Sequence, residues 1–281
     1  MTNSNNTVLV LGGTGKTGSR VAAHLRERSI PVRLGSRSAQ PPFDWNDRNT
    51  WAAALAGVSA VYIAYQPDLA APGAPEAISA LTAAARDSGV ARLVLLSGRG
   101  EPEAAECEQI VRDSGLETTV LRCSWFAQNF SEGGFAEFVR SGEVALPAGD
   151  VPEPFIDADD IAAAAVAALT EDRHIGAVYE LTGPRALTFA EAVGEIARAT
   201  GRDIAYIPIT RTDFVAALTT YEVPADEISL LDYLFGTVLD GRNSATADGV
   251  ERILGREPRD FADYARATAA AGAWSAAPDP A

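Results

Sequence analysis

The chain has 281 residues, of which 47% are hydrophobic, and its formal net charge is −15. This length and composition allow one large core, or a core with a smaller lobe, and exclude both a disordered protein and a short disulfide scaffold. Its 23 Lys and Arg face 38 Asp and Glu and form no cluster, so we expect no nucleic-acid partner.

Metal-binding and membrane-spanning signals are absent from the sequence. The chain has two cysteines, Cys107 and Cys123, and two histidines, His24 and His174, so no metal site or disulfide framework is expected. No apolar run approaches the roughly 18 residues of a membrane span, and the first residues lack the order of a signal peptide. We expect a cytoplasmic protein without membrane contact, and a homodimer is compatible with the sequence.

Strands and helices alternate through the first half of the chain. Continuous apolar runs, which are typical of strands buried in a parallel sheet, predict strands at 7–11, 31–34, 59–64, 92–96 and 118–121. Apolar residues at helical spacing predict helices at 17–28, 47–55, 76–87 and 102–113. Because crossovers between parallel strands are right-handed, this alternation predicts an α/β fold with a Rossmann-type doubly wound parallel sheet.

The character of the sequence changes after residue 151. Two short strands are expected at 178–181 and 204–207, and the remainder is mostly helical, at 189–200, 212–218, 226–238 and 259–271. We therefore predict a Rossmann domain over residues 1–150 and a smaller, helix-rich C-terminal lobe over residues 151–281. This lobe would lie on the substrate side and would not be fully independent.

The strongest motif is GGTGKTG at 12–18, between the first strand and the first helix. Its G-x-x-G-x-x-G spacing in that context is typical of dinucleotide binding. Gly12 would permit the tight turn, Gly15 the approach of a pyrophosphate, and Gly18 close packing of helix on strand. The helix N-terminus would then offer N–H groups to the phosphates, with the remaining loop residues Thr14, Lys16 and Thr17.

The motif allows two alternatives to this interpretation. A phosphate loop of the nucleotide-hydrolase kind needs a glycine five residues before Gly15, and that position is Val10. A plain glycine-rich turn is the other alternative. The second strand favours NADP(H) over NAD(H), because it ends Gly35-Ser36-Arg37-Ser38 without the acid that binds the ribose of NAD. The alternative for Arg33 and Arg37 is ordinary solvated charge. The planar fork of Arg37 suits a 2′-phosphate.

The chain resembles the NmrA-like branch of the atypical short-chain dehydrogenases. The resemblance rests on the glycine loop, on Ser114-Gly115-Leu116, on TVLRCSWFAQNF at 119–130, on DADDI at 157–161 and on residues 248–261. The family includes NADPH-dependent quinone and dye reductases and cofactor-sensing regulators without known turnover. The resemblance also implies that Asp44 and Trp45 line the adenine side and that Glu108 lies near the cofactor.

The sequence departs from the chemistry of most short-chain dehydrogenases. Those enzymes use a tyrosine and a lysine four residues later, whereas Lys16 is the one lysine of this chain and no tyrosine lies between Tyr65 and Tyr179. The usual Tyr–Lys mechanism is therefore excluded. Direct hydride transfer from NADPH needs positioning more than side-chain chemistry.

The carboxyl ends of the strands are expected to hold the cofactor and substrate. Beyond the residues already named, the predicted cofactor-binding set is Ala64, Tyr65, Gln66, Ser97, Gly98, Cys123, Ser124, Trp125 and Phe126.

Within and beside this set, Tyr65, Ser97 and Asn129 are candidate catalytic residues, as proton donor or hydrogen-bonding groups. Trp125 and Phe126 would stack on a flat substrate. The competing interpretations are that both rings belong to the core, that Ser97 caps a strand end and that Cys123 is an inert buried thiol. Glu106 and Glu108, two residues apart on one helix, are expected to be mostly solvated.

These observations favour an NADPH-dependent oxidoreductase that transfers hydride to a small quinone, enone or similar flat carbonyl substrate. The alternative is a non-catalytic NADP(H)-sensing regulator of the NmrA type, which the missing Tyr–Lys pair favours. A third hypothesis is an isomerase or lyase with structural NADP. Fold alone does not decide between them.

Overall fold

The computed structural model describes residues 6–275, which form two compact units. The first unit contains the chain up to residue 123 together with 158–181 and 248–256, and the second contains 124–157, 182–247 and the chain from 257. The units therefore do not meet at residue 150, the boundary expected from the sequence. The chain enters the second unit after Cys123 and returns at Ala158 to complete the sheet of the first.

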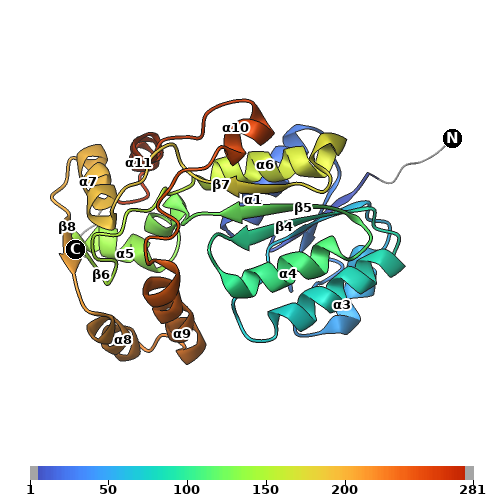
Figure 1. The fold of residues 1–281 in the computed structure, drawn as a ribbon, viewed down its shortest axis with the longest axis horizontal. Coiled ribbons are helices and arrows are strands. Elements are labelled where there is room, and N and C mark those ends of the chain that lie inside the picture. The colour runs from blue at the N-terminus through green and yellow to red at the C-terminus, as the bar shows by residue number, and fades with distance from the viewer. Residues whose placement is uncertain (1–5, 276–281) are drawn as a thin grey trace, which may run out of the picture. The chain divides into compact units, whose positions relative to one another are not determined.

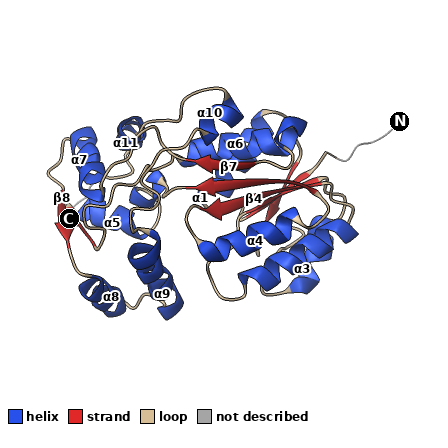
Figure 2. Cartoon of the chain, viewed as in Figure 1, coloured by secondary structure: helices blue, strands red, loops and turns tan. Residues whose placement is uncertain are grey.

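A six-stranded parallel sheet forms the centre of the first unit (Figure 2). The strand order is β2-β1-β3-β4-β5-β7. The strands are β1 (Val8–Leu11), β2 (Val32–Gly35), β3 (Ala60–Ile63), β4 (Arg92–Gly98), β5 (Glu117–Cys123) and β7 (Val178–Leu181). All residues of β1 and β3 are buried, as their apolar runs predicted. The Rossmann-type fold is confirmed.

The strand order places a switch point beside β1. The chain runs from β1 outward to β2 and then returns to the other side of β1 as β3. In open α/β sheets the crevice at such a reversal, at the carboxyl ends of the strands, is where ligands bind. The glycine loop follows β1 at this point.

Helices cover both faces of the sheet in the first unit (Figure 1). Helices α1 (Lys16–Glu27) and α6 (Ala158–Thr170) pack together on one face, where Arg20 Nε lies 2.8 Å from Asp159 Oδ1. Helices α3 (Ala74–Asp87) and α4 (Pro102–Arg112) cover the other face. The short helices are α2 (Trp51–Leu55) and α10 (Gly249–Leu254).

The second unit is mostly helical and has a core rich in phenylalanine. A parallel pair of short strands, β6 (Glu143–Leu146) and β8 (Ala205–Pro208), forms its small sheet. Its helices are α5 (Gly134–Ser141), α7 (Phe189–Thr200), α8 (Arg211–Thr220), α9 (Ala225–Tyr233) and α11 (Phe261–Ala270). Phe130 is fully buried, and the rings of Phe135, Phe155, Phe189 and Phe261 surround it at 5.7–6.1 Å.

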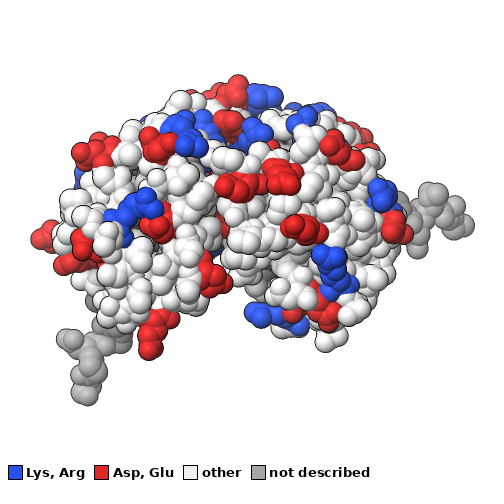
Figure 3. Space-filling model, turned by 60° about the horizontal axis from the view of Figure 1, so that its bottom comes forward, with Lys and Arg blue, Asp and Glu red and all other residues white. Residues whose placement is uncertain are grey.

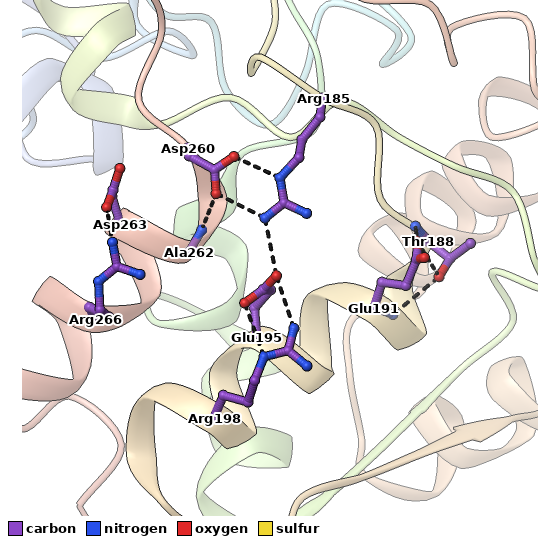
Figure 4. Close-up of polar contacts among 9 residues, drawn as sticks. All are labelled: Arg185, Thr188, Glu191, Glu195, Arg198, Asp260, Ala262, Asp263 and Arg266. Atoms are coloured by element: carbon purple, nitrogen blue, oxygen red, sulfur yellow. Dashed lines mark hydrogen bonds and ion pairs between the residues drawn. The ribbon is translucent and has the colours of Figure 1, made fainter.

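Ion pairs join α7 to the start of α11 within this unit (Figure 4). Arg185 binds both carboxylate oxygens of Asp260, at 2.7 and 2.9 Å, and also binds Glu195 on α7 at 3.1 Å. A capping box of Thr188 and Glu191 begins α7. The carboxylate of Asp260 also caps α11 by accepting from the Ala262 N–H.

The structure corrects one expected helix in this unit. The sequence predicted a continuous helix over 226–238, but α9 ends at Tyr233 and a π-helical turn follows over Leu234–Val238. A Cβ at Gly236 would lie 2.1 Å from the guanidinium carbon of Arg211, so the absent side chain gives the arginine its place. Helix α5 and strand β6 were not predicted.

Candidate functional site

The glycine loop has the geometry that its spacing predicted. Gly12 lies in the left-handed region at φ +68°, which favours glycine, and its carbonyl accepts from the Gly15 N–H at 2.9 Å. A Cβ at Gly18 would lie 2.2 Å from the Gly12 oxygen, so α1 can approach β1 only with glycine there. No side chain caps the N-terminus of α1. The arrangement fits a pyrophosphate, which would accept hydrogen bonds from these backbone N–H groups.

The side chains of the loop divide between surface and core. Thr14 and Gly15 are exposed, whereas Thr17 is buried and its hydroxyl accepts a 3.0 Å hydrogen bond from the Tyr62 hydroxyl. Thr17 can therefore serve a phosphate through its backbone N–H, while its side chain fixes α1 against β3. Lys16 is half-buried as the first residue of α1.

The variants Gly18→Ala and Gly15→Ala should separate packing from cofactor binding. The new methyl at position 18 has no room, so we expect a loss of about 3 kcal/mol of unfolding free energy, measured by urea denaturation. A Cβ at Gly15 would meet the Gly12 oxygen at 3.3 Å, and its φ of −83° suits alanine. Gly15→Ala should therefore fold normally and weaken NADPH binding in calorimetry, because the methyl lies where the phosphates approach. Equal stability of the two variants would contradict the packing role of Gly18.

The end of β2 leaves one arginine available to a ligand. Arg33 Nη1 binds the carbonyl oxygens of Ala54 and Ala56 at 2.6 and 2.8 Å, so this arginine closes the C-terminus of α2. Arg37 is exposed and has no hydrogen-bond or ion-pair partner within residues 6–275. Its guanidinium is free to pair with a phosphate, as the sequence predicted.

Aromatic rings bring the segment after β2 next to the end of β3. The ring of Trp45 lies 4.8 Å from that of Tyr65 and 5.9 Å from that of Trp51, in edge-to-face arrangements. Trp51 is buried, and its indole N–H donates to the Asp44 carbonyl at 2.7 Å. The predicted site residues Trp45 and Tyr65 are thus in contact. Burial and the nearby Cys107 and Glu76 raise the pKa of the Tyr65 hydroxyl.

The predicted residue Ser97 belongs to a buried polar network. Ser97 is 4% exposed, and its hydroxyl donates to Glu108 Oε1 at 2.7 Å. Glu108 in turn accepts from Arg122 on β5, with a shortest distance of 2.6 Å. Since the Ser97 proton points at a carboxylate, its hydroxyl offers lone pairs to a ligand and is poorly placed to donate a proton.

The burial of Glu108 contradicts the expectation that this residue is solvated. It is 3% exposed, whereas Glu106 is exposed as expected. The physical reason is the face of α4 that carries it: the buried residues of this helix are Ala104, Cys107, Glu108 and Val111. Their spacing of three, four and seven is that of an inward helix face. This periodicity was present in the sequence and would have identified Glu108 as buried.

The remaining predicted residues on the strand ends differ in exposure. Ala64 is half-buried and Gln66 is exposed after β3, and Gly98 is half-buried as the last residue of β4. Cys123 ends β5 and is buried, and its burial raises the pKa of the thiol, which makes it unreactive. No group of three or more His, Cys, Asp or Glu side chains in the described part of the chain could hold a metal ion.

The predicted residues after β5 all lie in the second unit. Ser124 is buried, and its hydroxyl has no hydrogen-bond partner among the described residues. Trp125 is half-buried and packs on Phe189 and Phe235, with ring centroids at 5.4 and 4.9 Å. Phe126 and Asn129 are also half-buried. Trp125 thus combines a core contact with a part-exposed surface.

Charge is mixed over the surface. On the face drawn in Figure 3, acidic and basic side chains are interspersed, and no continuous basic area is visible. No helix among residues 6–275 is long and apolar enough to cross a membrane.

Three comparisons place the chain among known proteins. It is 32% identical to an NAD(P)H azoreductase of Xenophilus azovorans over 94% of this chain and 98% of that protein. Its fold matches an NADPH-dependent quinone oxidoreductase of Escherichia coli solved with NADPH, with a TM-score of 0.76, 23% identity and coverage of 92% and 98%. It also matches the Citrobacter triphenylmethane reductase solved with NADP(H), with a TM-score of 0.73, 20% identity and coverage of 94% and 99%.

A family match covers the glycine loop and most of the sheet. Residues 12–172 match the family described as NAD(P)H-binding. This span begins at Gly12 and includes Arg37, Tyr65 and Ser97. The loop geometry and the exposed Arg37 fit the cofactor of this family. The match confirms the family resemblance as far as NAD(P)H binding. The chain belongs to the NAD(P)H-binding family.

Proposed function

We propose that this protein is an NADPH-dependent reductase that acts on a quinone, an enone or a similarly flat conjugated carbonyl compound. The observation that carries the proposal is the glycine loop at the switch point together with Arg37, which is exposed and has no hydrogen-bond or ion-pair partner among the described residues. The relatedness to an NAD(P)H azoreductase supports a conjugated acceptor. When bound, NADPH supplies the hydride, and the protein supplies position.

The chain's own residues support chemistry without a Tyr–Lys pair. Its one lysine, Lys16, begins α1 and cannot stand four residues after a tyrosine on a later helix. Ser97 offers hydroxyl lone pairs to a bound amide or amine, and the backbone N–H groups of the glycine loop offer hydrogen bonds to the phosphates. These groups bind and orient, which is what direct hydride transfer needs most.

The proposal predicts NADPH oxidation that depends on a conjugated acceptor. Purified protein should oxidise NADPH when given a panel of quinones, enones and azo dyes. The loss of NADPH is followed by the fall in absorbance at about 340 nm, where reduced nicotinamide absorbs. NADH at the same concentration is the matched control and should react more slowly, since it lacks the phosphate that Arg37 would bind. Tight NADPH binding with no turnover across the panel would contradict the proposal and favour the NADP(H)-sensing alternative.

A further inference from the structure

Two carboxyl groups lie at the strand-end edge of the first unit, outside the residues discussed so far. Asp68 follows β3, and Glu101 follows β4, the neighbouring strand. The ends of parallel neighbours meet at one edge, so both acids follow the same strand ends as Tyr65 and Ser97. Each acid is half-buried.

Gly98 provides the seat for one of these carboxyl groups. A Cβ at Gly98 would lie 2.0 Å from Glu101 Oε1 and 2.4 Å from Oε2, so the carboxyl packs against the bare α-carbon that ends β4. Glu101 Oε2 is buried and has no hydrogen-bond partner in the described part of the chain. A shielded oxygen without a partner is costly when it belongs to a carboxylate, and far less costly when the carboxyl is neutral.

Burial raises the pKa of Asp68, and a side-chain hydrogen bond with Glu101 lowers the pKa of Asp68 while it raises the pKa of Glu101. Two carboxyl groups can form such a bond only if one of them carries a proton. Asp68 Oδ1 also accepts from the Ala70 N–H at 2.8 Å, which stabilises the ionised form of Asp68. No backbone N–H of the described residues donates to the Glu101 carboxyl in this way, so the shared proton belongs chiefly to Glu101.

The surrounding charges keep that proton in place at neutral pH. Burial, followed by the charge of Asp68, raises the pKa of Glu101 to about 9, and Glu103 and Glu108 raise it further in the same direction. Arg99, two residues earlier in the chain, binds Glu180 through its guanidinium at 2.9 Å. A carboxyl group of this kind carries a proton and is neutral at pH 7, and it is still a stronger acid than the Tyr65 hydroxyl, whose pKa is raised by burial.

We infer that Glu101, held by Gly98 and Asp68, is the proton donor of the reduction. This inference rests on the proposed reductase function. The acceptor takes a hydride from NADPH, which is oxidised to NADP⁺, at one carbon of the conjugated carbonyl system. The O–H bond of Glu101 breaks, and a new O–H bond forms on the substrate oxygen. Glu101 remains as a carboxylate beside Asp68, and the repulsion between them favours recovery of the proton from water.

The first test compares Glu101→Gln on two kinds of acceptor. Reduction of a neutral quinone requires a proton, so its kcat should fall about 100-fold in the variant. A cationic triarylmethane dye becomes neutral on taking a hydride and needs no proton, so its kcat should stay within about twofold of the wild type. The matched control is Glu106→Gln, the same change at an exposed position of α4, which should leave both rates unchanged.

The second test uses the pH dependence of quinone reduction, which also decides the matter if no cationic dye is reduced. The wild-type rate should fall on the alkaline side with an apparent pKa near 9, because Glu101 loses its proton there. Asp68→Asn keeps an oxygen for the Ala70 N–H but removes the charge that holds the proton. In Asp68→Asn, the rate of quinone reduction should therefore begin to fall at a pH at least about one unit lower than in the wild type. In Glu101→Gln, this fall at alkaline pH should be absent.

The outcomes separate this inference from the proposed function. Failure of the wild type to reduce any acceptor would overturn the reductase proposal itself. Three results in an active wild type would overturn the role of Glu101 alone. The first is an unchanged quinone rate in Glu101→Gln, and the second is an equal loss of rate on both kinds of acceptor in that variant. The third is a pH–rate profile whose alkaline side is not moved by Asp68→Asn.

Discussion

Replacing Arg37 with glutamate should weaken NADPH binding about 100-fold and leave NADH binding within about threefold of the wild type. Arg37 is exposed, follows the second strand and has no partner in residues 6–275, so its guanidinium is available to the 2′-phosphate. The variant removes a charge-assisted bond and adds repulsion between two anions. NADH has no phosphate at that position, which is why its affinity should hardly change.

Calorimetric titration of both cofactors measures this difference directly. Arg86→Glu is the matched control, since it makes the same change of charge at an exposed position of α3. It should leave both affinities unchanged, and the net charge is equal in the two variants. An equal loss of NADPH and NADH affinity in Arg37→Glu would show that this residue does not read the phosphate.

Replacing Glu108 with alanine should cost about 3 kcal/mol of unfolding free energy. The carboxylate is almost fully buried, and it accepts hydrogen bonds from the Ser97 hydroxyl and from Arg122. Its loss leaves both donors without their partner and opens a cavity under α4. The estimate stands at the lower end for a broken buried ion pair, because the Arg122 side chain is 33% exposed and water can compensate in part.

Urea denaturation followed by circular dichroism gives the required free energies. Glu106→Ala removes the same carboxylate two residues earlier on α4, at an exposed position, and should change stability by less than about 0.5 kcal/mol. If Glu108→Ala unfolded at the same urea concentration as the wild type, the network would have no structural value. A loss confined to Glu108→Ala would show that the inward face of α4 depends on this acid.

The sheet of the first unit was predictable because its signals are local. The run at Val8–Leu11 is apolar throughout, and a strand buried on both faces needs that pattern. The glycine loop was equally predictable, since the left-handed turn at Gly12 and the close contact at Gly18 are requirements of the backbone. The NAD(P)H-binding family followed from these residues.

What escaped prediction depends on contacts between distant residues. The interaction of Asp68 with Glu101 joins the loops that follow β3 and β4, and no residue spacing in the sequence indicates it. The π-helical turn over Leu234–Val238 was likewise not expected, and within it Gly236 lies against the Arg211 guanidinium. Local propensity favours a continuous helix there, and tertiary packing overrides it.

The interleaving of the two units restricts how this protein can be cut or recombined. A fragment ending at residue 150 would lack β7, and β5 would then expose a row of unpaired backbone groups along the edge that β7 covers. Such an edge invites aggregation. Exchanging the second unit for that of a relative would require a splice after each of residues 123, 157, 181, 247 and 256. Because neither unit is one continuous stretch of chain, a crossover at a single point would always divide at least one of the two cores.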